Sequence, residues 1–297
     1  MNQILMGAVS LGLLWSVMVI GVYITYRILD IADMSVEGTI TLGAAVASII
    51  ISKGGNPYLA TLAATCAGLM AGMVTGLLHT KLKIPALLSG ILTMIALWSV
   101  NLRVMGSANI STLRIDTIFT PLQNMGLTKD LSRIVLSGSF SLLLITILYW
   151  FFGTELGSAI RATGNNPNMV RAQGINTDTM KILGLMIANA LVATSGAMIA
   201  QSQNFADIQM GTGSMVIGLA SLIVGEVLFG KRNFYTRLLS LILGAILYRV
   251  IIALVMEMGM NPNDLKLFTA ITVALALALP QLKEYAQTIK HSMGRAA

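Results

Sequence analysis

The chain has 297 residues, of which 56% are apolar and only 10% are charged, and its mean hydropathy is +0.80. An average soluble domain carries roughly 25% charged residues, so this composition excludes a water-soluble fold and indicates a polytopic membrane protein. The net charge of +7 does not indicate nucleic-acid binding, because the basic residues stand singly or in pairs beside apolar runs and form no basic stripe.

Apolar runs recur along the whole chain with no polar domain between them, which predicts a single transmembrane domain over residues 1–297. A transmembrane helix needs about 20 residues to cross the hydrocarbon core. Runs that approach this length predict an all-α bundle of about nine spans, at 4–26, 38–52, 57–80, 84–105, 134–153, 180–202, 211–230, 236–256 and 266–281. The second and the last are short, so the predicted count is good to about one span.

Basic residues predict the orientation, because Lys and Arg concentrate in the cytoplasmic loops of membrane proteins. When the nine spans alternate in direction, the larger basic group falls on one side: Arg27, Lys81, Lys83, Arg161, Arg171, Lys181, Lys231, Arg232, Arg237, Lys283, Lys290 and Arg295. The smaller group falls on the other side: Lys53, Arg103, Arg114, Lys129, Arg133 and Lys266. We therefore expect the N-terminus outside the cell and a C-terminal tail, residues 282–297, in the cytoplasm.

Two connections between the spans are too long to be simple turns. The external one, residues 106–133, mixes apolar and polar side chains, and we expect it either to lie on the membrane or to meet a partner. The cytoplasmic one, residues 154–179, is the more informative because it contains the local signals of helix beginnings and ends.

These signals predict two short helices. Thr154 is a candidate N-cap and Gly164 a candidate stop for the first helix. An asparagine cap followed by Pro167 begins the second helix, and Gly174 closes it. From spacing alone the segment is either an ordinary loop whose arginines follow the orientation rule, or a stiff protrusion that fits a groove on another protein.

A family resemblance favours the protrusion. The run Arg161, Ala162, Thr163, Gly164, Asn165, Asn166 and Pro167, followed by Arg171 and Gly174, resembles the coupling segment of bacterial ABC importer permeases of the branched-chain amino-acid and ribose type. The similarity extends to residues 30–38 and to a glycine-rich run that ends at Arg232, so it covers nearly the whole chain. In that family the segment docks into the ATPase subunit.

The resemblance implies a permease subunit of an importer in the bacterial cytoplasmic membrane. Such a subunit pairs with a second permease copy, here expected to form a homodimer, works with cytoplasmic ABC ATPase subunits and receives a small solute from an external substrate-binding protein. Residues 33–38 and 83–94 most resemble permeases for tryptophan, tyrosine or related substrates, which implies an amino acid or a related compound. The chain has no phosphate-binding loop, so we expect ATP on the partner subunit and no cofactor or metal on this chain.

Ionisable groups inside a membrane are costly and are therefore candidates for the translocation path. Asp33, Ser35 and Glu37 lie where the first span gives way to the second, either as a turn at the membrane edge or as a break that faces a water-filled path. Arg249 lies too deep in its span to reach the cytoplasmic surface, and either binds a substrate carboxylate or makes a structural contact. Asn101, at the outer end of its span, faces a substrate or binding protein, or anchors the helix at the interface.

Other functional classes fit the sequence less well. An ion-coupled secondary transporter is the alternative, but such carriers place carboxylates or broken helices near the midplane, where this chain offers at most Glu37 or Arg249. A membrane-embedded enzyme needs a cluster of histidines or carboxylates at one membrane face, which the sequence lacks. We therefore expect a transport subunit and no catalytic residues.

Two further features are expected to have structural roles, one in helix packing and one in local charge pairing. Gly68, Gly72 and Gly76 recur every four residues, which places them on one helix face and lets a neighbouring backbone approach, within the chain or from a second copy. Glu226 lies within about one turn of two basic residues that follow it, and we expect it to pair with them locally.

Overall fold

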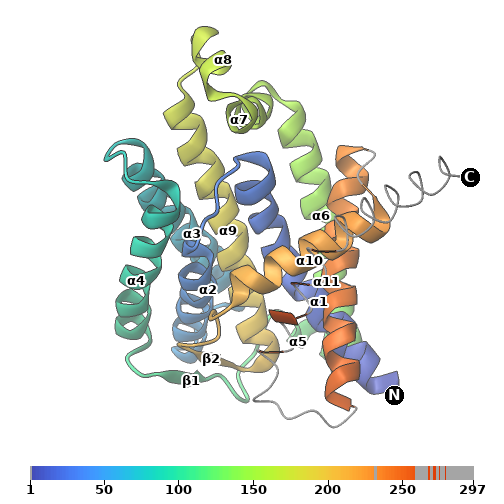
Figure 1. Cartoon of the computed structure of the whole chain (residues 1–297). Coiled ribbons are helices and arrows are strands. Elements are labelled where there is room, and N and C mark those ends of the chain that lie inside the picture. The colour runs from blue at the N-terminus through green and yellow to red at the C-terminus, as the bar shows by residue number, and fades with distance from the viewer. Residues whose placement is uncertain are drawn as a thin grey trace, which may run out of the picture.

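The computed structural model describes residues 2–230 and 233–257, together with isolated helical positions at 267, 270, 271, 274 and 278. The described part is a bundle of helices (Figure 1). Its first half comprises α1 (Asn2–Tyr23), continued by the π-helix η1 (Ile24–Ile28), then α2 (Ser35–Ser52), α3 (Pro57–Thr80), α4 (Ala86–Met105), β1 (Asn109–Ser111), α5 (Thr120–Asn124) and α6 (Lys129–Gly153). Its second half comprises α7 (Glu155–Asn165), α8 (Pro167–Ala172), α9 (Thr177–Gln203), β2 (Phe205–Asp207), α10 (Ser214–Phe229) and α11 (Phe234–Glu257).

The connections define two ends of the bundle. Helices α7 and α8 stand at one end, which we call the α7–α8 end, and the two strands lie at the other, which we call the β1–β2 end (Figure 1). Helix α1 runs from the β1–β2 end toward the α7–α8 end, and the long helices after it alternate in direction. The two long connections predicted from the sequence therefore lie at opposite ends of the bundle, residues 154–179 at the α7–α8 end and residues 106–133 at the β1–β2 end.

Seven helices of the described part are long and apolar enough to cross a membrane, which confirms a polytopic, all-α membrane protein. The predicted span 211–230 corresponds to α10, whose 16 residues rise about 24 Å, less than the roughly 30 Å of a hydrocarbon core. Helix α10 runs obliquely to its neighbours (Figure 1). The predicted span 266–281 lies outside the described residues except for isolated positions, so the count of nine stays a prediction.

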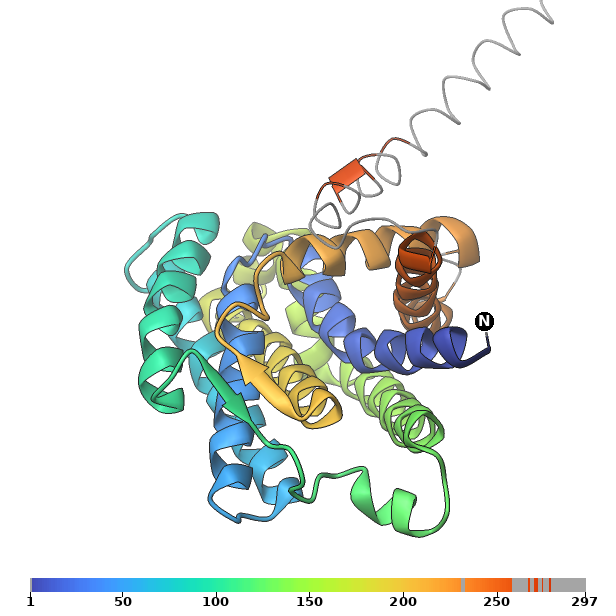
Figure 2. The same cartoon turned by 90° about the horizontal axis from the view of Figure 1, so that it is seen from below.

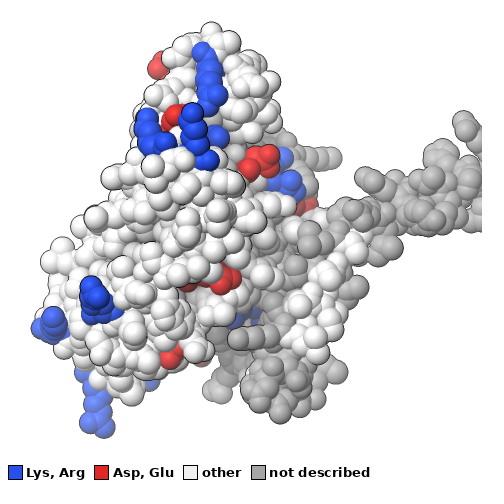
Figure 3. All heavy atoms as spheres, turned by 60° about the vertical axis from the view of Figure 1, so that its left-hand side comes forward, with Lys and Arg blue, Asp and Glu red and all other residues white. Residues whose placement is uncertain are grey.

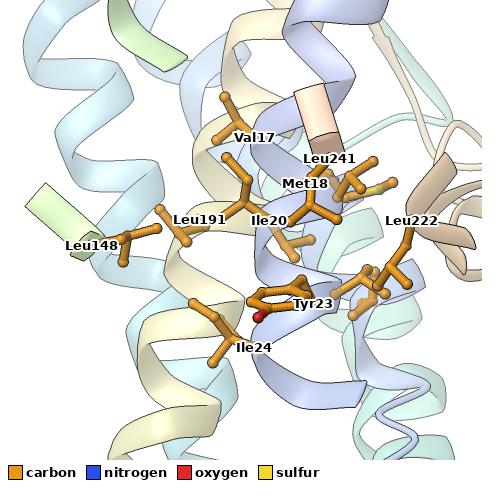
Figure 4. Packing of buried hydrophobic residues seen from close by; sticks show 14 of the residues in the cluster. Val17, Met18, Ile20, Tyr23, Ile24, Leu148, Leu191, Leu222 and Leu241 are labelled. Carbon is orange, nitrogen blue, oxygen red and sulfur yellow. The ribbon is translucent and has the colours of Figure 1, made fainter. Parts of the chain in front are cut away.

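Helices α1 and α9 form the centre of the bundle because they are apolar on all sides. Val17, Met18 and Ile20 of α1 have no exposed surface. They are surrounded by side chains from four other helices, among them Leu148 of α6, Leu191 of α9, Leu222 of α10 and Leu241 of α11 (Figure 4). The apolar faces of α1 and α9 are thus buried against protein.

Helices α3, α4 and α6 instead expose large apolar side chains. Met70, Ile95 and Trp150 are 70%, 60% and 71% exposed. On the face shown in Figure 3, Lys and Arg side chains gather toward the two ends, and the surface between them is nearly free of charge apart from a small acidic patch. Such a band suits contact with lipid tails, because exposing an apolar surface to hydrocarbon costs no free energy.

Gly68, Gly72 and Gly76 lie against α9 of the same chain. A Cβ added at Gly68 or Gly72 would overlap a carbonyl oxygen of α9, that of Asn189 or Leu185 respectively. A Cβ at Gly76 would lie 3.0 Å from the Cα of Ile182. The three glycines therefore let the α3 and α9 backbones approach closely within one subunit.

We expect Gly72→Ala to destabilise the protein by about 1–3 kcal/mol, because the added methyl group has to push two backbones apart. Thermal unfolding of the purified permease measures the effect. Gly7→Ala in α1 is the matched control, since a Cβ there meets no atom within 4 Å. Equal melting temperatures for the two variants would show that α3 and α9 are not packed this closely.

The segment 106–133 folds over the β1–β2 end. Strand β1 pairs antiparallel with β2, with Asn109 opposite Asp207 (Figure 2). The sequence did not predict this pairing, because three residues per strand are too few to produce a periodic pattern. Further along, Ile118 and Phe119 are buried, and the Ile118 amide donates to Oε1 of Gln201 at 3.1 Å. Part of the segment is therefore anchored in the bundle.

Candidate functional site

Helices α7 and α8 meet at a corner, and the two short helices that the sequence predicted are confirmed. Thr154 caps α7, because its hydroxyl accepts a hydrogen bond from the Gly157 amide at 3.3 Å. Asn166 caps α8 by accepting from the Met169 amide at 3.1 Å, with Pro167 at the first helical position. Beyond α8, the glycine at position 174 has a φ of +81°, so the predicted stop is confirmed there.

The predicted stop at Gly164 is wrong, because α7 continues to Asn165. Gly164 instead lies against the last turn of η1. A Cβ added to it would overlap the carbonyl oxygen of Ile28 and lie 2.9 Å from the Cα of Leu29. The glycine is needed for a close contact between α7 and the end of the first span.

The two arginines of the corner have different surroundings. The guanidinium of Arg161 lies 5.5 Å from the ring centroid of Phe234 on α11. Arg171 donates from Nε to the Thr177 hydroxyl at 2.7 Å and lies 3.6 Å from the Asp178 carboxylate, so it ties α8 to the start of α9. The exposed side chain of Met169 leaves an apolar tip on α8.

Asp33 lies in the break between η1 and α2 and has no exposed surface. Its Oδ1 accepts from the Ser35 amide at 2.9 Å, and its Oδ2 accepts from Nδ2 of Asn189 at 2.8 Å. The Ser35 hydroxyl donates in turn to Oδ1 of Asn189 at 3.2 Å. This network, which we call the Asp33 network, joins the start of α2 to the middle of α9.

Sequence reasoning did not single out Asn189. Its signal was an amide near the middle of a largely apolar span, which is the type of residue that hydrogen-bonds between transmembrane helices.

Glu37 lies in the first turn of α2 and also caps a second helix. Its Oε1 accepts from the Gly213 amide at 3.1 Å. Gly213 is the N-cap residue of α10, and its φ of +79° favours glycine. A glycine has no side chain with which to cap the helix itself. A carboxylate from α2 thus satisfies an amide at the N-terminus of α10, where the helix dipole also favours negative charge.

Asn101 of α4 is buried, and its Nδ2 donates to the carbonyl oxygen of Gly38 at 3.0 Å. Because that oxygen can only accept, the amide has to present its nitrogen to α2. Its Oδ1 has no hydrogen-bond partner among the described residues.

Glu37 and Asn101 line one cavity of about 370 Å³ between α2, α4 and the segment before α10. Its lining combines polar groups with an apolar wall: Glu37, Gly38, Thr41, Met94, Ile95, Trp98, Ser99, Asn101, Ile208 and Thr212. Ser35 lies one turn before Gly38 on α2. Four of the five candidate path residues therefore meet around the start of α2, in the part of the bundle that also holds the cavity.

Arg249 lies apart from this cavity. Its guanidinium stacks on Trp15 of α1, 4.0 Å from the ring centroid. Cation–π stacking of this kind stabilises a charge that is removed from water. The contact links α11 to α1.

Glu226 pairs with Arg27 at 2.6 Å, which joins the end of α10 to η1. The two basic residues expected as its local partners, 231 and 232, lie outside the described residues. The long-range pair was not predicted, because 199 residues separate its members in the chain.

The comparisons with known proteins agree with this architecture. Residues 4–279 match the family described as branched-chain amino acid transport system / permease component. A tyrosine transport system permease protein of Clostridioides difficile is 42% identical over 271 residues, covering 91% of this chain and 89% of that protein. An uncharacterised protein of Rickettsia prowazekii is 32% identical over 280 residues, covering 93% and 97%.

A more distant relative is the autoinducer 2 import system permease protein of Yersinia pestis, which is 27% identical over 198 residues, or 66% of this chain and 54% of that protein. Among solved structures, none matches the chain significantly. The family match spans nearly all of the chain and overlaps every helix described above. The chain therefore belongs to the branched-chain amino acid transport permease family, and is a multi-pass membrane permease component of a bacterial import system rather than an enzyme.

Proposed function

We propose that two copies of this chain form the membrane core of an ABC importer, driven by two cytoplasmic ATPase subunits and supplied by an external substrate-binding protein. The observation that carries the proposal is the corner made by α7 and α8, which stands out from the bundle (Figure 1) and is capped at both helix starts. A rigid protrusion with an exposed apolar tip at Met169 fits a groove on a partner protein. ATP binds to the partner, and this chain transmits motion.

The orientation follows from the basic residues. Lys81 lies in the connection that adjoins the α7–α8 end, and Arg161 and Arg171 lie in α7 and α8 themselves. Positive charge marks the cytoplasmic side, so the α7–α8 end faces the cytoplasm and the N-terminus lies outside. With α10 and residues 266–281 counted as crossings, the nine spans leave the C-terminal tail in the cytoplasm.

A contiguous set of contacts links the corner to the cavity. Helix α7 touches the end of the first span through Gly164 and Ile28. The chain then passes through the break that holds Asp33 and enters α2, whose Glu37 caps α10 at the cavity wall. Movement of α7 with its ATPase would therefore shift the two helix starts that border the cavity, and so switch the path between outward-facing and inward-facing states.

The cavity suits an amino acid with a large apolar or aromatic side chain. Trp98 and Met94 supply an apolar wall, and the carboxylate of Glu37 and the amide of Asn101 supply polar groups that accept hydrogen bonds from an ammonium group. The 42% identical relative is named for tyrosine transport, which supports the same class of solute. We assign this cavity to the translocation path.

We expect Glu37→Gln to reduce solute uptake by about tenfold, because loss of the charge removes the group that attracts an ammonium ion. The glutamine keeps an oxygen that can accept from the Gly213 amide, so α10 stays capped and the protein stays folded. Uptake by the assembled importer in proteoliposomes measures the effect, with the exposed Glu257→Gln as control. Undiminished uptake by Glu37→Gln would show that this carboxylate is not part of the translocation path.

The assignment as a whole is tested by purification from the native host. We expect an ATPase subunit to co-purify with the chain and its hydrolysis to rise when a substrate-loaded binding protein is added. Uptake by the chain alone, driven by a proton or sodium gradient, would instead support an ion-coupled carrier.

A further inference from the structure

A second cavity, of about 480 Å³, lies at the α7–α8 end and has no part in the proposed translocation path. We call it the arginine pocket and define it by its lining residues: Tyr23, Tyr26, Arg27, Ile28, Asp30, Arg161, Gly164, Asn165, Phe234 and Arg237. Its three guanidinium groups come from three separate elements, η1, α7 and α11. Segments far apart in the chain thus bring their positive charges to one space.

The carboxylates near the pocket do not balance these charges. Arg27 is paired with Glu226 at 2.6 Å. Arg161 and Arg237 form no ion pair with any described residue, and the Nε of Arg237 is buried without a hydrogen-bond partner there. Asp30 is the one carboxylate among the described residues of the lining, and it is exposed. The described part of the pocket is therefore short of negative charge.

The tyrosine hydroxyls and the asparagine amide of the lining can each donate a hydrogen bond, and the hydroxyl of Tyr23 also accepts one from Arg237. The phenol groups of Tyr23 and Tyr26 and the amide of Asn165 lie beside the arginines. Guanidinium groups bind phosphate oxygens through two parallel hydrogen bonds, and hydroxyl and amide donors complete such sites. The stacking of Arg161 on Phe234 holds one guanidinium at the pocket without using its hydrogen atoms.

We propose that the arginine pocket binds a phosphate group, between the end of the first span, α7 and α11. Two sources supply that chemistry, the headgroup of an anionic phospholipid and a free phosphate ion. A lipid headgroup suits the position, because the pocket lies where a transmembrane helix ends and basic pockets between helices bind acidic headgroups. A bound phosphate would tie α7 to both α1 and α11, since Arg161 and Arg237 would hold the same anion.

A lipid headgroup bound in the arginine pocket would affect the corner made by α7 and α8. Gly164, through which α7 touches Ile28, forms part of the pocket wall. Occupancy would therefore stiffen the contact between the corner and the first span. This consequence rests on the proposed function of α7, whereas the binding site itself does not.

Binding of defined probes to the full-length purified permease tests the proposal. The probes are phosphatidylglycerol, phosphatidylcholine and inorganic phosphate, with binding followed by native mass spectrometry for the lipids and by thermal shift at constant ionic strength for the ion. We expect Arg237→Gln to weaken binding of one anionic probe by about tenfold or more. Arg103→Gln, an exposed arginine near the β1–β2 end, is the matched control and should bind as the wild type does.

The outcomes separate the sources. Loss of phosphatidylglycerol binding in Arg237→Gln, with phosphatidylcholine unaffected, assigns the pocket to a lipid headgroup. Loss of the response to inorganic phosphate without any lipid preference assigns it to the free ion. Equal binding of every probe by wild type, Arg237→Gln and Arg161→Gln overturns the proposal, and Arg161→Gln also serves if Arg237→Gln does not fold. The readout is binding, so failure of the importer assignment would leave it unaffected.

Discussion

Gly164→Ala is expected to abolish ATP-driven uptake while the permease still inserts and the ATPase subunits still hydrolyse ATP. The added methyl group would overlap the Ile28 carbonyl oxygen and crowd the backbone of Leu29. Backbone atoms have no alternative rotamer, so α7 or η1 has to shift, at a cost of about 1–3 kcal/mol. The shift changes how the corner made by α7 and α8 packs against the end of the first span. That contact is the one that we propose transmits motion.

Uptake and hydrolysis measured on the same proteoliposomes distinguish uncoupling from misfolding. We expect hydrolysis to persist but to lose its stimulation by the loaded binding protein. Gly153→Ala is the matched control, because it lies at the neighbouring end of α6 and a Cβ there meets no atom within 4 Å. Uptake by Gly164→Ala at the wild-type rate would mean that coupling does not pass through the contact between α7 and η1.

The parts of the corner that sequence predicts correctly depend on local chemistry. A cap such as Thr154 or Asn166 bonds to an amide three residues further along, so the neighbouring sequence contains the whole interaction. Gly164 was predicted as a helix stop for the same local reason, and the prediction is wrong. A glycine serves equally as a stop or as a close contact, and only the position of Ile28 distinguishes the two.

The groups around the cavity show why the rest could not be predicted. The hydrogen bond from Asn101 to Gly38 joins residues 63 positions apart, and that from Gly213 to Glu37 joins residues 176 apart. Composition marks such residues as costly inside a membrane and therefore as candidates. Their partners depend on how the helices pack, which apolar periodicity does not encode when helices are apolar on all sides.

Asp33→Ala is expected to cause the largest loss of stability among the changes considered. The substitution leaves the Ser35 amide without its acceptor and removes one of the two acceptors of Nδ2 of Asn189, which also donates to the Leu185 carbonyl at 3.1 Å. A buried donor without a partner costs about 1–3 kcal/mol, so we expect a loss of several kcal/mol in the free energy of unfolding. Asp130→Ala, which breaks a partly exposed ion pair with Arg133, should cost less than about 1 kcal/mol.

A double-mutant cycle shows whether the Asp33 network acts as a unit. Asn189→Ala alone leaves one oxygen of a buried carboxylate without its donor and should also destabilise, whereas Asp33→Ala in the Asn189→Ala background should cost much less than it does in the wild type. Unfolding in detergent micelles by denaturant gives the four free energies. Simple additivity of the two losses would show that Asp33 and Asn189 do not stabilise each other.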